Sequence, residues 1–149
     1  MKPSLPHVTD PRPMEVETAL REFLRAFGNC DLPTMERLFA PDCVSFDQVV
    51  AGTSGEAVSD LTPYRRCAGM PPAMRRVALE LPTKTPAPPY HSLVPQDLMI
   101  QVFGNAAVAT FHIERDGILR RRTVVFAKRD EGWRIVHLHA SSVQVDGSI

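Results

Sequence analysis

The first part of the chain has the hydrophobic pattern of helices. From Glu15 onward, apolar residues recur at steps of three and four, which places them on one helical face: Val16, Leu20, Phe23, Leu24 and Phe27. Gly28 follows the run, as glycine often does at a helix C-terminus. After Asp31, a possible N-terminal cap, the apolar positions Met35, Leu38 and Phe39 predict a short second helix that ends before Pro41-Asp42.

The middle of the chain has a less regular pattern. Cys43 to Asp47 predicts a short strand, and Val49 to Ala51 continues it after a bend. A third helix is predicted from about Gly55 to Cys67. Met74 to Leu81 is compatible with a strand, but Pro71-Pro72 precedes it and PTKTPAPP follows it. We interpret this proline cluster as a loop, because too little chain remains for a second domain.

The last third of the chain has the pattern of a sheet. Short turns at Gly104-Asn105, Asp116-Gly117 and Asp130-Glu131-Gly132 separate four predicted strands. These strands run from Leu98 to Phe103, Ala106 to Arg115, Leu119 to Lys128 and Trp133 to Val143. Such spacing predicts an antiparallel meander. Helices followed by a meander predict an α+β domain, in which three N-terminal helices pack on one face of a curved antiparallel sheet.

Composition narrows the class of protein. The 149 residues, 44% of them hydrophobic, are enough for one domain with a sizeable core. We expect a loose, proline-rich arm over residues 1–13 and a single domain over residues 14–146. Seventeen basic residues balance seventeen acidic ones, so no net charge favours nucleic acid or a membrane surface. The apolar runs are too short to span a bilayer, and the N-terminus lacks the apolar segment of a secretory signal.

The cysteines also fit a single-domain protein that is neither secreted nor inserted in a membrane. Cys30, Cys43 and Cys67 are scattered and form no C-x-x-C pair. Reduced thiols in a cytoplasmic protein are therefore expected, rather than a disulfide framework or a zinc site.

Three stretches resemble one superfamily of small-molecule-binding proteins. LFAPDCVSFD resembles the opening of ketosteroid isomerase, LVPQDLMIQVFGNAAVATF has the spacing of its central hairpin, and RDEGWRIVHLHAS resembles the closing strand of the calcium/calmodulin-dependent kinase II association (hub) domain. The chain thus resembles the SnoaL-like and ketosteroid isomerase-like members of the nuclear transport factor 2-like (NTF2-like) superfamily. The resemblance implies a cone-shaped fold with a cavity between the helices and the sheet, and a homodimer formed through the outer sheet face. It implies no particular reaction, because this fold has many functions.

The resemblance also assigns strand residues to the cavity. Successive residues of a strand point to opposite faces. Aligned with ketosteroid isomerase, Val136, Leu138 and Ala140 would pack outward. The cavity side would hold Ala109, Phe111, Ile113, Arg122, Val124, Phe126, Ile135, His137, His139 and Ser141, while His112 and Glu114 point away.

Asp47 is the first candidate catalytic residue. It matches the position of the proton-abstracting aspartate of ketosteroid isomerase. Burial at the mouth of an apolar cavity would favour the protonated form of this carboxyl, as a general base near neutral pH requires. The alternative is an aspartate that caps the turn into Gln48.

The match to ketosteroid isomerase fails at the oxyanion hole. Phe23 and Val124 occupy the positions of its tyrosine and its protonated acid, and neither side chain donates a hydrogen bond. Losing both donors removes most of the transition-state stabilisation, so steroid isomerisation is disfavoured.

His137 and His139 have three possible roles. They are structural residues of a half-buried wall, acid/base or ligand-orienting groups, or metal ligands. A metal site needs a third ligand, and His112 points away in this register. We therefore predict a catalytic role for both and no metal.

The run Arg120-Arg121-Arg122 also has two interpretations. It is either a solvated strand edge that discourages aggregation, or Arg122 faces inward and holds an anionic group. The hub domain is similar in carrying arginines in a pocket that accepts small carboxylates, although its strand arginine aligns nearer Thr123 or Val124.

Two functions follow as hypotheses. The first is a cofactor-independent acid/base enzyme of isomerase, dehydratase or cyclase type, with Asp47, His137 and His139 as catalytic residues. A compact organic substrate would contact Tyr64, Phe23, Phe111, Arg122 and Ser141, with Tyr64 at the mouth of the cavity. The second is a non-catalytic ligand-binding or oligomerisation module resembling the hub domain.

Overall fold

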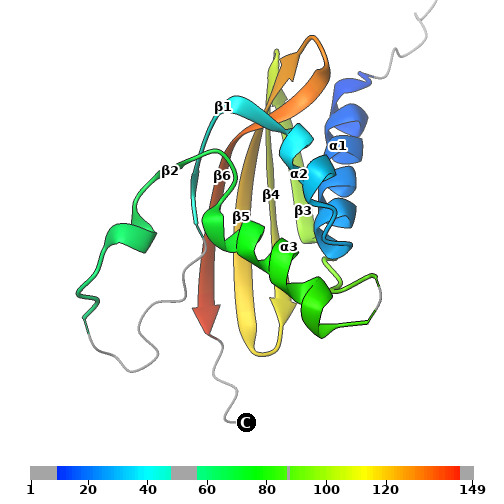
Figure 1. Ribbon diagram of the computed structural model, residues 1–149. Coiled ribbons are helices and arrows are strands. Elements are labelled where there is room, and N and C mark those ends of the chain that lie inside the picture. The colour runs from blue at the N-terminus through cyan, green and yellow to red at the C-terminus, as the bar shows by residue number, and fades with distance from the viewer. Residues whose placement is uncertain (1–9, 48–56, 87, 145–149) are drawn as a thin grey trace, which may run out of the picture.

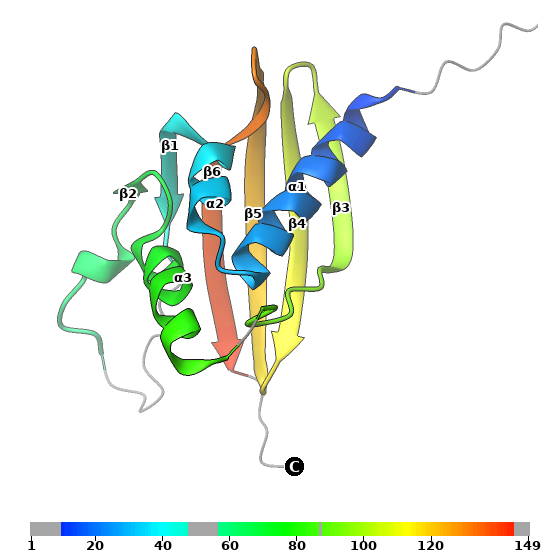
Figure 2. The same cartoon turned by 45° about the vertical axis from the view of Figure 1, so that its right-hand side comes forward.

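The computed structural model describes residues 10–47, 57–86 and 88–144. These residues form three helices and a six-stranded sheet, and the helices cover one face of the sheet (Figures 1 and 2). The helices are α1 (Arg12–Gly28), α2 (Leu32–Leu38) and α3 (Pro72–Lys84), with a short 3-10 turn at Thr62–Tyr64. The strands are β1 (Phe39–Phe46), β2 (Cys67–Ala68), β3 (Gln96–Phe103), β4 (Ala106–Arg115), β5 (Ile118–Arg129) and β6 (Gly132–Gln144).

The sheet has the strand order β2-β1-β6-β5-β4-β3. Strands β3 to β6 pair antiparallel with their sequence neighbours, which confirms the predicted meander. Strand β1 lies parallel to β6, so the sheet is mixed rather than wholly antiparallel. This parallel pairing brings the C-terminal end of β1, and with it Asp47, to the same end of the sheet as the end of β6.

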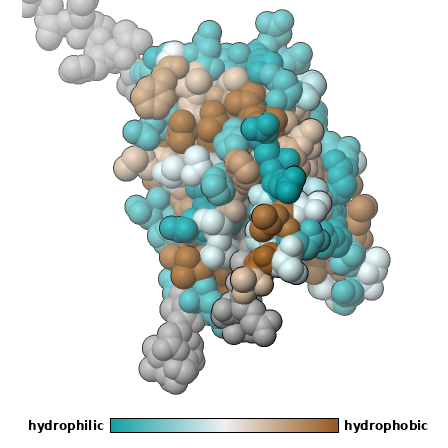
Figure 3. All heavy atoms as spheres, turned by 90° about the vertical axis from the view of Figure 1, so that its left-hand side faces the viewer, coloured by the Kyte–Doolittle hydropathy of each residue, from teal (hydrophilic) through white to brown (hydrophobic). Residues whose placement is uncertain are grey.

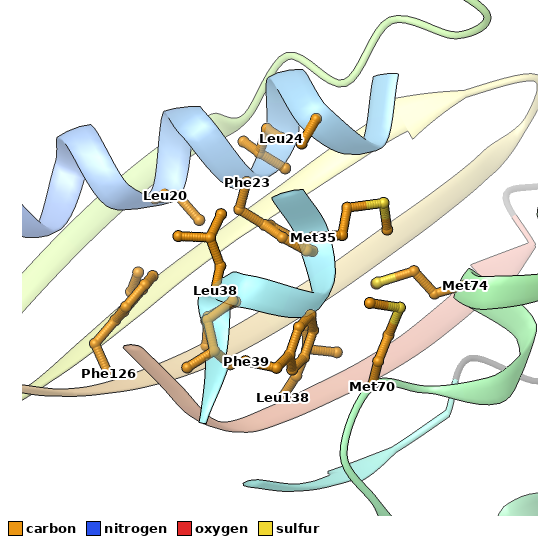
Figure 4. Close-up of a cluster of buried hydrophobic side chains, with 14 of the residues drawn as sticks. Leu20, Phe23, Leu24, Met35, Leu38, Phe39, Met70, Met74, Phe126 and Leu138 are labelled. Carbon is orange, nitrogen blue, oxygen red and sulfur yellow. The ribbon is translucent and has the colours of Figure 1, made fainter. Parts of the chain in front are cut away.

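The first two helices follow the predicted pattern. The apolar face of α1 is buried at Val16, Leu20 and Phe23. The side chain of Asp31 accepts a hydrogen bond from the backbone N–H of Thr34 at 3.3 Å, which caps α2. Figure 4 shows these helices above the sheet, with their buried side chains directed onto it. Each large apolar side chain removed from water in this way stabilises the fold by about 1.5–3 kcal/mol.

The third helix differs from its predicted position. It runs over Pro72–Lys84, and not from Gly55 to Cys67, where the described residues form only the 3-10 turn and β2. Residues 49–51, 55 and 56 of the predicted strand and helix lie outside the described residues. Pro72 occupies the first turn of α3, where proline is well tolerated because that N–H has no helical partner. Met74 and Ala78 are buried one helical turn apart, so this segment has helical periodicity that its flanking prolines obscured.

A β-bulge in β6 divides the strand into two halves of opposite phase. Phe126 of β5 pairs with Ile135, and the next residue back along β5, Val125, pairs with His137. Val136 is therefore an extra residue without a partner on β5. Ile135 faces the helices before the bulge, whereas Leu138 and Ala140 face them after it. Strict alternation along this strand, on which the predicted register rested, does not hold.

Candidate functional site

A cavity of about 350 Å³ lies between α3, the C-terminal end of α1 and the inner face of the sheet. Most of its wall is apolar, and its charged or titratable residues come from β4, β5, the residue after β1 and the segment before β3. It is lined by Phe27, Asp47, Pro71, Ala73, Met74, Val77, Leu81, His91, Leu93, Ile113, Arg115, Arg120, Arg122 and Ala140. Apolar walls with a few convergent polar groups are typical of small-molecule sites.

Asp47 lies directly after β1 and lines this cavity, as predicted. Its Oδ2 atom accepts a hydrogen bond from the backbone N–H of Ala73 at 2.8 Å. Ala73 is in the first turn of α3, where backbone N–H groups lack helical acceptors. The carboxylate therefore caps α3 and fixes the end of β1 against it. The alternative role, capping the turn into Gln48, falls outside the described residues.

Arg122 also lines the cavity, as predicted from the strand phase. It lies on the inner face of β5, between Phe111 on β4 and Ala140 on β6. Burial lowers the pKa of the Arg122 guanidinium to about 10, the positive charge of Arg120 acts in the same direction, and Asp47 opposes both. The protein thus holds a cation in a poorly solvated position beside a carboxylate.

Arg120 and Arg115 complete the basic part of the wall. Arg120 shares the inner face of β5 with Arg122, two residues away, and donates a hydrogen bond to the carbonyl oxygen of Arg115 at 3.1 Å. Arg115 forms an ion pair with Asp116 at 3.4 Å. The alternation that placed Arg122 inward also predicts an inward Arg120, so the sequence contained this signal.

His91 is a site residue that sequence analysis missed. It lies just before β3, and its Nε2 atom is 2.8 Å from the carbonyl oxygen of Phe27 at the end of α1. The two rings meet edge to face, with centroids 4.7 Å apart. Burial lowers the pKa of His91, and the nearby charge of Arg115 acts in the same direction. Its position in a proline-rich segment without clear periodicity gave no signal of a buried histidine.

A small apolar recess of about 20 Å³ lies beside the cavity and shares Arg122, Phe27 and Met74 with it. Phe23 and Phe111, both predicted to contact substrate, line this recess rather than the main cavity. Val124 lies there as well, so the positions of the isomerase oxyanion hole form an apolar wall here. Figure 4 shows Phe23 projecting from α1 towards the sheet, with Met74 of α3 nearby.

Three residues predicted to line the cavity lie on the opposite face of the sheet. The bulge at Val136 turns His137, His139 and Ser141 outward, so the predicted register of β6 is wrong beyond Ile135. Leu138 and Ala140, which were expected to pack outward, are buried beneath the helices.

The outward residues have neighbours of their own. The rings of His137 and His139 contact the ring of Phe46, with centroid distances of 6.1 Å and 5.2 Å. Ser141 accepts a hydrogen bond from Nε of Arg121 at 3.2 Å.

Tyr64 is not part of the cavity wall. It ends the 3-10 turn between β1 and β2 and is half-buried there. Among residues 10–47, 57–86 and 88–144, no group of three or more His, Cys, Asp or Glu side chains is placed to hold a metal ion. Within the described helices, none combines the length and hydropathy needed to cross a membrane.

Solved structures with this fold belong to proteins of several kinds. A protein of unknown function from the DUF3225 family of Pectobacterium atrosepticum is 22% identical, with a TM-score of 0.63 over 91% of this chain and 93% of that one. A candidate dehydratase of the NTF2-like family from Streptomyces avermitilis is 23% identical, with a TM-score of 0.63 over 90% and 97%. The CaMKII hub of S. rosetta is 19% identical, with a TM-score of 0.60 over 91% and 100%. No protein of curated function matches this chain in sequence.

These likenesses confirm the predicted α+β, cone-shaped NTF2-like fold. At such identities they establish the fold and not an activity. The model of the SnoaL-like domain matches residues 16–146, which is most of the chain. This protein is therefore a member of the SnoaL-like domain family.

Proposed function

We propose that this protein binds a compact organic anion in the cavity and catalyses a cofactor-independent proton transfer on it. The observation that carries the proposal is that Asp47 and Arg122 line one cavity of about 350 Å³ with largely apolar walls. An isomerase, dehydratase or cyclase reaction would use such a pair, with the arginine holding the anionic group and the aspartate accepting a proton.

The charges of the wall support an anionic ligand. Three guanidinium groups and one carboxylate line the cavity, so cations are in excess there. Burial opposes the charge of Arg122 and lowers its pKa. A bound carboxylate would offset that cost, because a guanidinium donates two parallel hydrogen bonds to a carboxylate.

The position of Asp47 supports a role in proton transfer. One of its carboxylate oxygens accepts a hydrogen bond from Ala73, which fixes the orientation of the group. A carboxylate has a second oxygen with lone pairs of its own, and this oxygen would act as the proton acceptor. Steroid isomerisation is still disfavoured, because Phe23 and Val124 provide no hydrogen-bond donor to an oxyanion.

Calorimetric titration with benzoate as the probe tests anion binding. We expect the wild-type protein to bind benzoate and the Arg122→Gln variant to lose about tenfold or more in affinity, as expected for a charge-assisted contact. His139→Ala is the matched control, since His139 lies on the outer sheet face. Equal affinities for wild type and Arg122→Gln would contradict the proposal.

Proton transfer is tested separately by hydrogen exchange into the bound acid. In D₂O, the wild-type protein should exchange the CH₂ protons of phenylacetate, which lie next to its carboxylate, for deuterium. This exchange should be faster than with the Asp47→Asn variant. NMR integration of that position reports the rate. Benzoate binding together with equal exchange rates would reject the catalytic role of Asp47 and leave a ligand-binding protein.

Self-association is the second candidate function, and the outer sheet face supports it. Met99 and Phe103 of β3 are exposed there by 57% and 62%, and Val44 of β1 is also exposed. Figure 3 views the molecule from the left of Figure 1 and shows hydrophobic side chains in several patches among hydrophilic ones. Light scattering after gel filtration would give the mass of the wild type and of Val125→Glu, a change on the outer face of β5. A homodimer that becomes a monomer in the variant is expected, and a wild-type monomer would contradict it.

A further inference from the structure

The imidazole of His91 is held in one orientation by contacts from the end of α1. The backbone N–H of His91 donates to the carbonyl oxygen of Gly28 at 3.3 Å, beside a second bond of 2.8 Å from the N–H of Tyr90 to the same oxygen. Nε2 lies 2.8 Å from the carbonyl oxygen of Phe27, and the ring meets that of Phe27 edge to face. A side chain fixed by both its backbone and its ring keeps its polar atoms in a constant position.

The contact with Phe27 determines which nitrogen carries the proton. A carbonyl oxygen only accepts hydrogen bonds, so Nε2 must be the donor. In the neutral ring, Nδ1 is then left with a lone pair and no proton. Burial lowers the pKa of His91, which favours this neutral form.

The Nδ1 atom has no hydrogen-bond partner in the described part of the chain. Among the described residues, Nε1 of Trp133 is the fully buried side-chain polar atom that has no hydrogen-bond partner. Nδ1 of His91 also has no partner, so it is not fully buried. The His91 ring packs against Phe27, and both residues line the cavity that also holds Arg122.

A purely structural role accounts for only half of this arrangement. Donation by Nε2 satisfies a carbonyl at the C-terminal end of α1, where helical carbonyls lack partners. That role makes no use of the acceptor on the other side of the ring, and a glutamine or lysine would perform it equally well. An acceptor without a protein partner, on a side chain that lines a cavity with three arginines, is the unexplained feature.

We infer that Nδ1 of His91 accepts a hydrogen bond from a hydroxyl group of the ligand, so that the ligand is a hydroxy-substituted organic acid. This inference rests on the proposed function, since Arg122 would hold the carboxylate of the same molecule. The other cationic groups of the cavity wall, Arg115 and Arg120, donate hydrogen bonds and accept none. Apart from the carboxylate of Asp47, His91 is therefore the side chain in the described wall that can accept a hydrogen bond from a hydroxyl group.

The experiment compares benzoate with the three ring-hydroxylated benzoates by calorimetric titration. We expect at least one hydroxylated isomer to bind the wild-type protein about tenfold more tightly than benzoate, the gain of one buried hydrogen bond. The His91→Phe variant retains a ring against Phe27 and removes both ring nitrogens, so no acceptor remains, and benzoate binding by this variant shows that its fold is intact. In that variant the hydroxylated isomer and benzoate should bind with equal affinity.

The outcomes separate this inference from the proposed function. Benzoate binding that depends on Arg122, without any gain for a hydroxylated isomer, would overturn the role of His91 and leave the anion site in place. A gain that persists in His91→Phe would overturn it as well. Failure of benzoate and all three isomers to bind would reject the anion site itself. ¹⁵N NMR of the His91 ring gives a second test, since a proton on Nδ1 would contradict the assigned acceptor.

Discussion

The Oδ2 atom of Asp47 accepts a hydrogen bond from the backbone N–H of Ala73 at 2.8 Å. This bond joins the C-terminal end of a sheet strand to the first turn of a helix 26 residues further along the chain. Both residues line the cavity, so the bond also fixes two parts of its wall relative to each other. The candidate proton acceptor is therefore part of the framework that forms the site, which allows its structural and chemical roles to be separated by mutation.

Replacing Asp47 tests the structural role first. Asp47→Ala removes the acceptor for Ala73 and should lower the free energy of unfolding by about 1 kcal/mol, as loss of a helix cap does. Asp47→Asn retains a side-chain oxygen and should lose less than half of that. Urea denaturation followed by circular dichroism measures both. Equal stabilities of the alanine variant and the wild type would show that the bond to Ala73 does not stabilise the fold.

Arg122 is expected to reduce stability while it serves binding. A buried guanidinium loses solvation, and its lowered pKa means that this loss outweighs the attraction of Asp47, so the charge opposes folding. Arg122→Leu should therefore unfold at the same or a higher urea concentration than the wild type and lose benzoate binding. Arg121→Leu, a change on the outer face of the same strand, is the control for binding. A clear fall in stability of Arg122→Leu would mean that the arginine is a structural residue.

The sequence predicted those parts of the fold in which one periodicity continues without interruption. The apolar positions from Val16 to Leu24 lie on the buried face of α1, and the hairpins of β3 to β6 lie between the expected turns. It failed at α3, because Pro72 starts a helix at a place where proline was interpreted as a loop residue. The placement of Asp47 and Arg122 followed from the resemblance to ketosteroid isomerase, with strand alternation carrying it to Arg122.

The rest of the site depends on contacts that local patterns do not encode. His91 reaches the cavity because the chain turns back onto the end of α1, where Gly28 leaves room for it: a Cβ atom at Gly28 would lie 2.9 Å from the carbonyl oxygen of His91. One extra residue in β6 reversed the orientation of His137 and His139. Single-residue shifts of this kind have no signature in hydrophobic periodicity.

The bulge at Val136 makes a strong prediction about a deletion. Removing Val136 alone takes out the extra residue, so His137 stays outward and Leu138, which is only 1% exposed, stays in the core. Removing Val136 and His137 together would instead turn Leu138 away from the core, and loss of one such leucine costs about 2–5 kcal/mol. The double deletion should therefore have a much lower thermal midpoint than the single deletion. Similar midpoints for the two variants would mean that the strand tolerates the other register.

Cys43 is expected to be chemically inert in the folded protein. Burial raises the pKa of its thiol to about 11, and the negative charge of Asp42 acts in the same direction. The thiolate is the reactive form, so very little of it exists near pH 8. Mass spectrometry after iodoacetamide treatment should find Cys43 unmodified in native protein and modified in urea. Rapid modification of Cys43 under native conditions would contradict its buried position.

The lowered pKa of His91 predicts a loss of stability in acid. Burial is the main cause of the shift, and Arg115 is the charged neighbour that adds to it. The unfolded chain has a histidine pKa of about 6.5, so below that pH the unfolded state binds more protons at this position than the folded state. By linkage, the free energy of unfolding then decreases as the pH falls, and the contribution of His91 is complete only above pH 6.5.

His91→Gln isolates this contribution, because it removes the titrating group and retains a donor for Phe27. Urea midpoints measured from pH 7.5 down to pH 5 should fall more steeply for the wild type than for the variant. Other histidines and carboxylates titrate in both proteins, so the difference between the two curves reports His91 alone. Parallel curves would indicate that the His91 ring is solvated, and a shallower wild-type curve would indicate that its charged form is stabilised by the fold.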